Sequence, residues 1–551
     1  MEDLRRNKWL LLVSSLGVLA LLVAAAVQEN FLLEWRQIQA QARTDEGPLP
    51  MRLRQVVNPT LGIADRCVSC HVTMAPGENV ASAEMAAHPA VDHDPSEYGC
   101  TVCHGGQGRA TRKEDAHGTV EFWPEPMLPV GMSQAGCGTC HATIGVPRRE
   151  TLDAARATFE RLDCLACHRV DGRGGTIRPD GGGMEGPDLS RVGLGGFDRG
   201  WHEGHQKAAS GAATGPWKTS FGPVLDADRS SLDLYLSTRV GAPQLVAAKS
   251  VFHSTGCLGC HKVSGVGGDE GPDLTQGGKK DPARADFSAV PGPRTLAGWF
   301  AEHVRAPAAV VAGSQMPAAS ASDAEVEALT LYTLSLRRRD MPGTYLPRDR
   351  MRVSRLGERE FTSDGATLFG AFCSGCHGRQ GEGHRVPGMA FPSVANPDFL
   401  AVAPDSLIVE SILRGRPGRR MRAWGDATTG LSAEDVSAIV VYLRTLAAVP
   451  PPEDSRPGRW AHGDESIGER LYAASCAGCH GATGEGGEGP ALNNPVLQQF
   501  ATDTYLVETI ARGRRGTAMG AFLEPSPARR ALARSEIEAI VAFIRSWGGP
   551  S

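Results

Sequence analysis

The sequence has few aromatic residues, little net charge and no cysteine outside one repeated pattern. Aromatic side chains make up 6% of the 551 residues, which is few for the several hydrophobic cores that a chain of this length needs. The 57 basic and 62 acidic residues leave a net charge of −5, so the chain lacks the positive charge of a general nucleic-acid-binding protein. Something other than aromatic side chains must therefore fill part of the interior.

Every cysteine belongs to one five-residue pattern, Cys-x-x-Cys-His, which occurs seven times. This is the attachment signature of c-type haem, because the two thiols add to the haem vinyl groups and the adjacent histidine reaches the iron. A disulfide framework, a zinc ribbon or a thioredoxin-type redox pair needs no histidine after each cysteine pair. We therefore predict seven covalently bound haem c groups, and we number the motifs 1 to 7 in chain order.

The motifs supply the residues predicted to attach each haem. The predicted thioether cysteines are Cys67, Cys70, Cys100, Cys103, Cys137, Cys140, Cys164, Cys167, Cys257, Cys260, Cys373, Cys376, Cys476 and Cys479. The predicted proximal iron ligands are His71, His104, His141, His168, His261, His377 and His480.

One long apolar run lies near the N-terminus. Residues 9–27 carry no charge and follow Arg5, Arg6 and Lys8, which indicates a membrane span with its N-terminus in the cytoplasm. We predict a single anchor over residues 1–30 in the inner membrane, with the bulk of the chain in the periplasm, where c-type haem is attached. A cleaved signal peptide is the alternative, with a small-residue site at Ala24–Ala26, although its apolar region would be unusually long.

The spacing of the motifs divides the rest of the chain into two kinds of unit. Motifs 1 to 3 lie too close together for three separate domains, so we predict one compact trihaem module over residues 31–149. Motifs 4 to 7 are widely spaced, and each lies between a short amphipathic helix and an apolar helix that carries a packing aromatic. We therefore predict a mainly α fold with four further domains at 150–242, 243–345, 360–448 and 460–551. The intervening segments, about 341–360 and 450–457, are predicted linkers.

The repeat around motifs 4 to 7 resembles class I cytochrome c, in which the first and last helices cross and a methionine loop covers the far side of the haem. This resemblance implies a distal methionine late in each repeat, and such a ligand raises the potential. Three repeats have one in a loop before the last helix: Met316, Met421 and Met519. Met389 is the alternative to Met421.

The fourth repeat lacks a methionine at the corresponding place. Aligning Trp201 with Trp299 puts Lys218 where the next repeat has Met316. The simpler interpretation is that Lys218 is an ordinary surface residue. A second alternative is that the haem iron at motif 4 has no distal protein ligand. The candidate distal ligands at motif 4 are Lys218, His202, His205 and Met184.

The trihaem module has three histidines outside its motifs, namely His88, His93 and His117. Three haems and three spare histidines predict bis-histidine ligation, which gives lower potentials than histidine–methionine ligation. The sequence does not assign each histidine to a haem, and Met85 and Met132 remain as alternatives.

A second resemblance covers about residues 30–145. The neck around Glu34-Trp35, the run Asp65-Arg66-Cys67, the stretch Gly99–Ala110 and Ala116-His117-Gly118 resemble a family of membrane-anchored multihaem cytochromes. Members of that family accompany bacterial cytochrome b/Rieske quinol-oxidising complexes. The resemblance implies a place in a respiratory or photosynthetic chain and a quinol-oxidising complex as partner.

These observations predict a non-catalytic electron-transfer subunit. Electrons would enter at the low-potential cluster near the membrane and leave through the methionine-ligated haems to a soluble cytochrome or a terminal oxidase. The basic runs Arg414–Arg422 and Arg512–Arg515 are candidate docking sites or simply solvated faces. One alternative function is a multihaem reductase or peroxidase with substrate at an open fourth haem; another is a scaffold that binds a partner without carrying its electrons.

Overall fold

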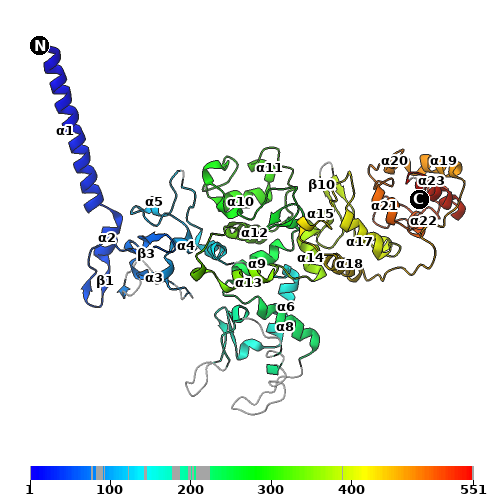
Figure 1. The fold of residues 1–551 in the computed structure, drawn as a ribbon, viewed down its shortest axis with the longest axis horizontal. Helices are drawn as coiled ribbons and strands as arrows, with labels where there is room; N and C mark the ends of the chain where they lie inside the picture. Colours follow the sequence, from blue (N-terminus) through cyan, green and yellow to red (C-terminus); the bar gives the residue numbers. More distant parts are fainter. Residues whose placement is uncertain are drawn as a thin grey trace.

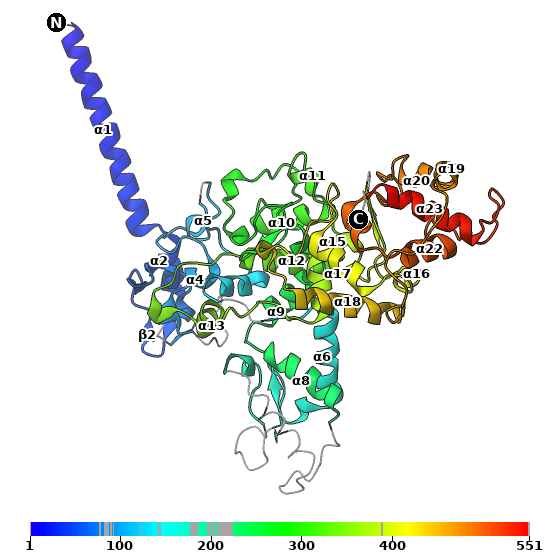
Figure 2. The same ribbon diagram turned by 45° about the vertical axis from the view of Figure 1, so that its right-hand side comes forward.

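The computed structural model describes residues 2–75, 79–81, 88, 91, 93–121, 123–141, 145–176, 186–195, 200, 204–205, 224–386 and 389–548. A long N-terminal helix leads into a row of small units that ends at the C-terminus, and one unit projects from the middle of this row as a separate lobe (Figures 1 and 2). The fold is mainly α, as predicted, and its strands are two or three residues long.

Helix α1 (Glu2–Phe31) contains the apolar run. Its 30 residues give a length of about 45 Å, and its most apolar window has a mean hydropathy of 2.7 with none of it buried in the protein. By length and composition this helix is able to cross a membrane. The short helix α2 (Glu34–Gln41) follows and buries Trp35 and Gln39 against the next unit.

The unit with motifs 1 to 3 has little regular structure. Strands β1 (Arg43–Thr44), β2 (Gly47–Pro48) and β5 (Val80–Ala81) form an antiparallel sheet in the order β2-β1-β5, and β3 (Val56–Asn58) pairs with β4 (Ile63–Asp65). Its helices are short: α3 (Pro95–Tyr98), α4 (Thr101–His104), α5 (Lys113–Ala116) and the 3₁₀ helices η1 (Cys67–Ser69), η2 (Val72–Met74) and η3 (Val130–Thr139).

The units with motifs 4 to 7 repeat one arrangement, in which an opening helix packs on a closing helix. The pairs are α6 (Arg149–Arg161) with α8 (Asp226–Ser237), α9 (Pro243–Phe252) with α12 (Asp323–Ser335), α14 (Gly365–Phe372) with α18 (Ala433–Ala447), and α19 (Glu465–Ser475) with α23 (Arg534–Ser546). This confirms the crossing pair that the resemblance to class I cytochrome c implied.

One aromatic contact joins the helices of each pair. The ring centroids lie 5.0 Å apart in Phe159–Tyr235, 4.6 Å in Phe252–Tyr332, 5.7 Å in Phe369–Tyr442 and 5.6 Å in Tyr472–Phe543. The closing-helix aromatics are therefore packing residues, as predicted. Capping boxes at Ser322–Glu325 and Ser432–Asp435 start two of these closing helices, because each satisfies free backbone N–H groups of the first turn.

The remaining elements connect these helices. Motif turns are η4 (Cys164–Ala166), η6 (Cys257–Gly259), α15 (Ser374–His377) and α20 (Ala477–His480). Hairpins are β6 (Arg169–Val170) with β7 (Arg173–Gly174), β8 (Lys262–Val263) with β9 (Val266–Gly267), and β10 (His384–Val386) with β11 (Met389–Phe391). Other helices are η5 (Val192–Gly195), η7 (Gly277–Lys279), η8 (Pro282–Arg284), α10 (Leu296–Arg305), α11 (Pro307–Val310), η9 (Gly343–Tyr345), α13 (Arg348–Leu356), α16 (Pro397–Leu400), α17 (Asp405–Arg414), η10 (Ala427–Thr429), α21 (Pro495–Phe500) and α22 (Asp503–Arg512).

The segment 341–360, expected to be a linker, folds back over the trihaem unit as η9 and α13. Tyr345 accepts a hydrogen bond from the Asn58 amide at 2.9 Å, and its ring packs against Tyr98 with centroids 5.6 Å apart. The Asp349 carboxylate lies 3.0 Å from Nδ1 of His141. The segment is thus part of the first unit's packing.

Candidate haem-binding sites

Each Cys-x-x-Cys-His motif forms one helical turn, and in units 4 to 7 the histidine is oriented by a proline carbonyl. The Nδ1···O distances are 2.9 Å for His168–Pro187, 2.8 Å for His261–Pro272, 2.9 Å for His377–Pro392 and 2.9 Å for His480–Pro490. A carbonyl oxygen only accepts, so Nδ1 carries the proton and donates. The Nε2 lone pair is then left for a metal, which is the usual arrangement of a ligating histidine.

Glycines next to three of these prolines make room for the imidazole. A Cβ on Gly271 would lie 2.4 Å from Cε1 of His261, one on Gly489 would lie 2.7 Å from Cε1 of His480, and one on Gly186 would lie 2.6 Å from Nδ1 of His168. Real Cβ atoms essentially never approach so closely. Any side chain here would displace the imidazole ring from its place.

The three spare histidines of the trihaem unit each face a different motif histidine. The ring centroids lie 6.3 Å apart for His71 and His117, 6.2 Å for His104 and His88, and 5.9 Å for His141 and His93. An iron held by two imidazoles at metal–nitrogen distances of ~2.0 Å separates the ring centroids by about 6 Å. The arrangement fits one distal histidine for each motif, with His117 opposite His71, His88 opposite His104 and His93 opposite His141.

A fourth facing pair occurs at motif 4. The rings of His168 and His205 lie 6.1 Å apart at 74°. Among the candidates for motif 4, His205 is the one that the structure describes, because Lys218, His202 and Met184 lie outside the described residues. Met85, an alternative in the trihaem unit, also lies outside them. Met132, the other alternative in the trihaem unit, packs against the main hydrophobic core.

Met421 and Met519 occupy equivalent loops. The carbonyl of Met421 accepts from the Arg416 N–H at 2.6 Å, and that of Met519 accepts from the Arg514 N–H at 2.7 Å. Both side chains pack against the core. Met316 is half-buried in the corresponding loop, and Met389 lies in strand β11, where it pairs with Val386.

His303 was not singled out by the sequence, and it also lies near a motif histidine. Its ring stacks on Trp299 with centroids 4.9 Å apart. Burial, with repulsion from His261 and Lys280, lowers the pKa of His303 to about 4. A neutral imidazole at this place makes His303 an alternative to Met316 at motif 5.

Four arginines in units 4 to 7 have a buried side-chain donor that no described residue satisfies. The Nε atoms of Arg239, Arg337, Arg422 and Arg514 are buried and have no hydrogen-bond partner among the described residues. A buried donor without a partner is costly. Haem carries two propionates, which would accept such donors, so the histidines, the glycine-lined space and these arginines together fit haem.

Comparisons with known proteins match parts of the chain to cytochrome families. The family model described as cytochrome c matches residues 245–337 and 466–548. The model for cytochrome C oxidase, cbb3-type, subunit III matches residues 360–443, and the model for cytochrome c554 and c-prime matches residues 35–105. The chain is a multihaem c-type cytochrome. Its cytochrome c domains imply covalently bound haem c.

Curated relatives match part of this cytochrome. The "Cbb3-type cytochrome c oxidase subunit FixP" of Bradyrhizobium diazoefficiens is 28% identical over 197 residues, which cover 34% of this chain and 60% of the relative. The "Cbb3-type cytochrome c oxidase subunit CcoP" of Azospirillum sp. is 26% identical over 204 residues, covering 34% of this chain and 62% of the relative. This cytochrome thus spans less than two thirds of the length of these relatives.

Among solved structures, cytochrome CL of Methylophaga aminisulfidivorans is 37% identical over 15% of this chain and 51% of that chain, with a TM-score of 0.13.

Within the trihaem unit, adjacent motifs of the cytochrome are in direct contact. Asp65 accepts hydrogen bonds from the backbone N–H groups of Cys100 and Thr101 at 2.6 and 2.7 Å, so the residues before motif 1 cap the turn of motif 2. A Cβ on Gly136, just before motif 3, would lie 1.9 Å from the Cys103 carbonyl oxygen. Asp65 was part of the run that carried the second resemblance, but its role in joining two motifs is visible only in the structure.

The basic runs of the cytochrome join its units to one another. Arg515 pairs with Asp398 at 2.7 Å, Arg422 pairs with Asp269 at 2.6 Å, and Arg419 bonds to the Glu485 carbonyl. Arg514 stacks on Phe399 with its guanidinium carbon 5.0 Å from the ring centroid. These four side chains therefore join units 5 to 7.

His141 differs from the other motif histidines whose Nδ1 partner is described, because its partner is a carboxylate. Asp349 is 9% exposed in its side chain and approaches Nδ1 of His141 at 3.0 Å. A carboxylate acceptor makes imidazole a more basic ligand, and a more basic ligand stabilises ferric iron. We expect Asp349→Asn to raise one midpoint potential by roughly 30–60 mV, which corresponds to a factor of about three to ten in the one-electron equilibrium.

A redox titration followed by electron paramagnetic resonance checks this expectation. The matched control is Glu358→Gln, since Glu358 belongs to the same segment and pairs with the exposed Arg352 at 2.8 Å. Unchanged potentials in Asp349→Asn would show that the carboxylate does not tune this site.

Proposed function

We propose that this cytochrome is a membrane-anchored electron-transfer protein with seven haem c groups. Electrons pass from a quinol-oxidising cytochrome b/Rieske-type complex in the inner membrane, through the trihaem unit, to a periplasmic acceptor or a terminal oxidase. The observation that carries the proposal is the set of facing histidines: His117, His88 and His93 stand opposite the motif histidines of the unit nearest the anchor.

The ligands support a direction for this transfer. When bound, haem c accepts and releases one electron at its iron, and methionine ligation gives the higher potential. The proposed histidine pairs belong to the unit next to the membrane anchor, whereas units 6 and 7, which contain Met421 and Met519, form the other end of the row (Figure 1). Electrons would therefore move downhill away from the membrane.

The partners rest on two likenesses. The trihaem unit resembles cytochromes that accompany cytochrome b/Rieske complexes, which supports a quinol-oxidising donor. The curated relatives are subunits of cbb3-type cytochrome c oxidases, which supports an oxidase at the C-terminal end. We propose that the periplasmic units lie between these two membrane complexes.

The number and ligation of the haems provide the first test. We expect a pyridine haemochrome assay to give seven haems per chain, since each motif has both cysteines and its histidine. We expect near-infrared magnetic circular dichroism to show histidine–methionine ligation at three haems and bis-histidine ligation at four, matching the four facing pairs. A count of two methionine-ligated haems that Met316→Leu leaves unchanged would assign His303 instead of Met316 to motif 5.

Carbon monoxide tests the catalytic alternative, because it binds ferrous haem with an open or easily displaced sixth position. We expect no change in the spectrum of the fully reduced protein, since His205 faces His168 at the site where an open iron was considered. Binding at one haem that disappears in a motif 4 deletion would favour a reductase or peroxidase.

A further inference from the structure

We propose that the electron path is branched: it runs through motifs 1, 2, 3, 5, 6 and 7, and motif 4 is a second point of electron entry that joins the path from the side. This inference rests on the proposed electron-transfer function. It concerns the order in which the units lie in space, which differs from their order along the chain.

Motif 3 lies directly against unit 5. The two residues between its cysteines, Gly138 and Thr139, contact the end of helix α12. A Cβ on Gly138 would lie 1.9 Å from the Ser335 carbonyl oxygen, and the Thr139 carbonyl accepts from the Arg339 N–H at 2.9 Å. One turn earlier on α12, Tyr332 packs on Phe252 of the helix that leads into motif 5. The contact between motif 3 and unit 5 therefore omits unit 4.

Motifs 5 and 6 also touch. A Cβ on Gly256, the residue before motif 5, would lie 2.0 Å from the backbone nitrogen of Gly375 inside motif 6. Cys260 and Cys376 form a side-chain hydrogen bond, which lowers the pKa of Cys260; both sulfurs would become thioethers when haem is attached. Unit 7 then follows through the pairing of Asp398 with Arg515.

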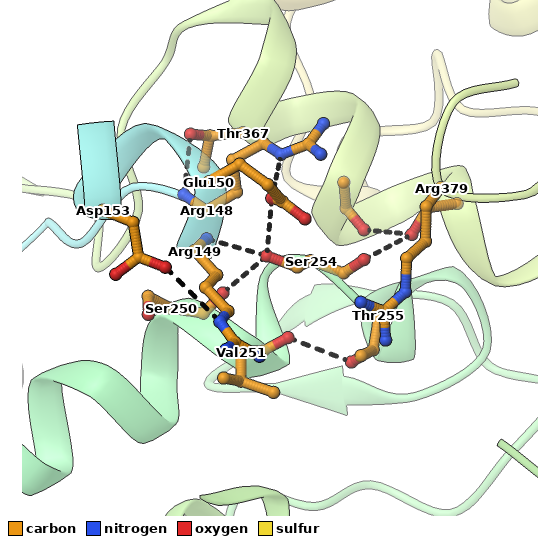
Figure 3. A network of polar contacts seen from close by, with 12 residues as sticks. Arg148, Arg149, Glu150, Asp153, Ser250, Val251, Ser254, Thr255, Thr367 and Arg379 are labelled. Atoms are coloured by element: carbon orange, nitrogen blue, oxygen red, sulfur yellow. Dashed lines mark hydrogen bonds and ion pairs between the residues drawn. The ribbon is translucent and has the colours of Figure 1, made fainter. Parts of the chain in front are cut away.

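Motif 4 lies at the other end of helix α6 from the row. The start of this helix forms a three-way junction, where the Arg148 N–H donates to Thr367 at 3.1 Å and the Arg149 N–H donates to Ser254 at 2.7 Å (Figure 3). Helix α6 has 13 residues, about 20 Å in length, and motif 4 follows its last turn. The turn η4 packs on α6 and β7 of its own unit, and both views show this unit as a lobe outside the row (Figures 1 and 2).

The ligand geometry gives the branch a direction. His205 faces His168, and two histidines give a lower potential than the methionine-containing sites of units 6 and 7. A soluble one-electron donor would be oxidised at motif 4 and would reduce the haem iron there from ferric to ferrous. The electron would then move downhill into the row. No bond is made or broken in this step.

Removal of single haems tests the branch. The full chain is held by its own anchor in a bilayer on an electrode, with soluble ferricytochrome c as acceptor. We expect Cys164→Ala/Cys167→Ala to carry the wild-type current. The matched control, Cys257→Ala/Cys260→Ala, should lose at least tenfold, which corresponds to roughly 1.4 kcal/mol in the barrier. A haemochrome count of six in both variants shows that the other haems are attached.

The current of the wild-type chain tests the proposed electron transfer, and the current of the motif 4 variant tests the branch. A wild-type chain that carries no current overturns the proposed electron transfer itself. A wild-type chain that conducts, with a motif 4 variant that loses as much current as the control, overturns the branch and places motif 4 in the row.

His205→Met tests the direction of entry without removing a haem. We expect one bis-histidine signal to disappear from the magnetic circular dichroism spectrum and one low midpoint potential to rise. Unchanged spectra and potentials would show that His205 is not a ligand, and a wild-type motif 4 potential above those of units 6 and 7 would make this site an exit instead.

Discussion

Exchanging Met519 for histidine is expected to lower the midpoint potential of the haem at motif 7 and to slow electron delivery at the end of the row. Axial ligands set haem potentials over a range of about 0.8 V, and loss of a thioether ligand is expected to lower this one by on the order of 0.2 V. The haem at motif 7 would then lie below that of motif 6, where Met421 is unchanged. Electrons would collect at motif 6, and reduction of a soluble acceptor would slow.

Two further variants define this result. Met519→Leu removes the ligand without replacing it, so the reduced protein should bind carbon monoxide at one haem. Met351→Leu changes a methionine of α13, outside the proposed methionine sites, and should leave all potentials as they are. If Met519→His leaves every midpoint potential in place, Met519 is not the distal ligand.

The repeating elements could be predicted from the sequence because each depends on residues close together in the chain. The crossing helices of units 4 to 7 follow from local amphipathic patterns, and aromatic pairs such as Phe369–Tyr442 then join them. Haem attachment follows from a five-residue motif. The sequence also singled out His88, His93 and His117, since they are the three histidines of residues 31–149 that lie outside the motifs.

The arrangement of the units could not be predicted, because it depends on contacts between distant residues. The carboxylate beside His141 comes from Asp349, 208 residues later in the chain, on a segment whose composition is that of a linker. The contact of Gly256 with Gly375 joins motifs 5 and 6 through two residues without side chains, which leave no hydrophobic pattern. At motif 4 the sequence left Lys218, His202, His205 and Met184 as candidates, and only the described geometry brings one of them, His205, to His168.

Replacing Gly271 with alanine is expected to remove the haem at motif 5 and so to interrupt the row at its centre. A Cβ at this position would lie 2.4, 2.6 and 2.9 Å from Cε1, Nδ1 and Nε2 of His261. The methyl group and the whole imidazole ring cannot occupy these places together, so the ring must leave its hydrogen bond to the Pro272 carbonyl. Haemochrome analysis should give six haems, and current from the membrane side should fall as it does in the motif 5 cysteine variant.

Gly277→Ala provides the matched control, because a Cβ there meets its nearest atom at 3.4 Å, an ordinary contact. Both glycines belong to the segment between motif 5 and α10, so a general weakening of this segment would affect both variants. Because only the Cβ at Gly271 would meet the imidazole of His261, we expect only Gly271→Ala to lose haem. A normal haem count and unchanged potentials in Gly271→Ala would mean that the chain can shift around His261, and the glycine would then be dispensable for haem attachment.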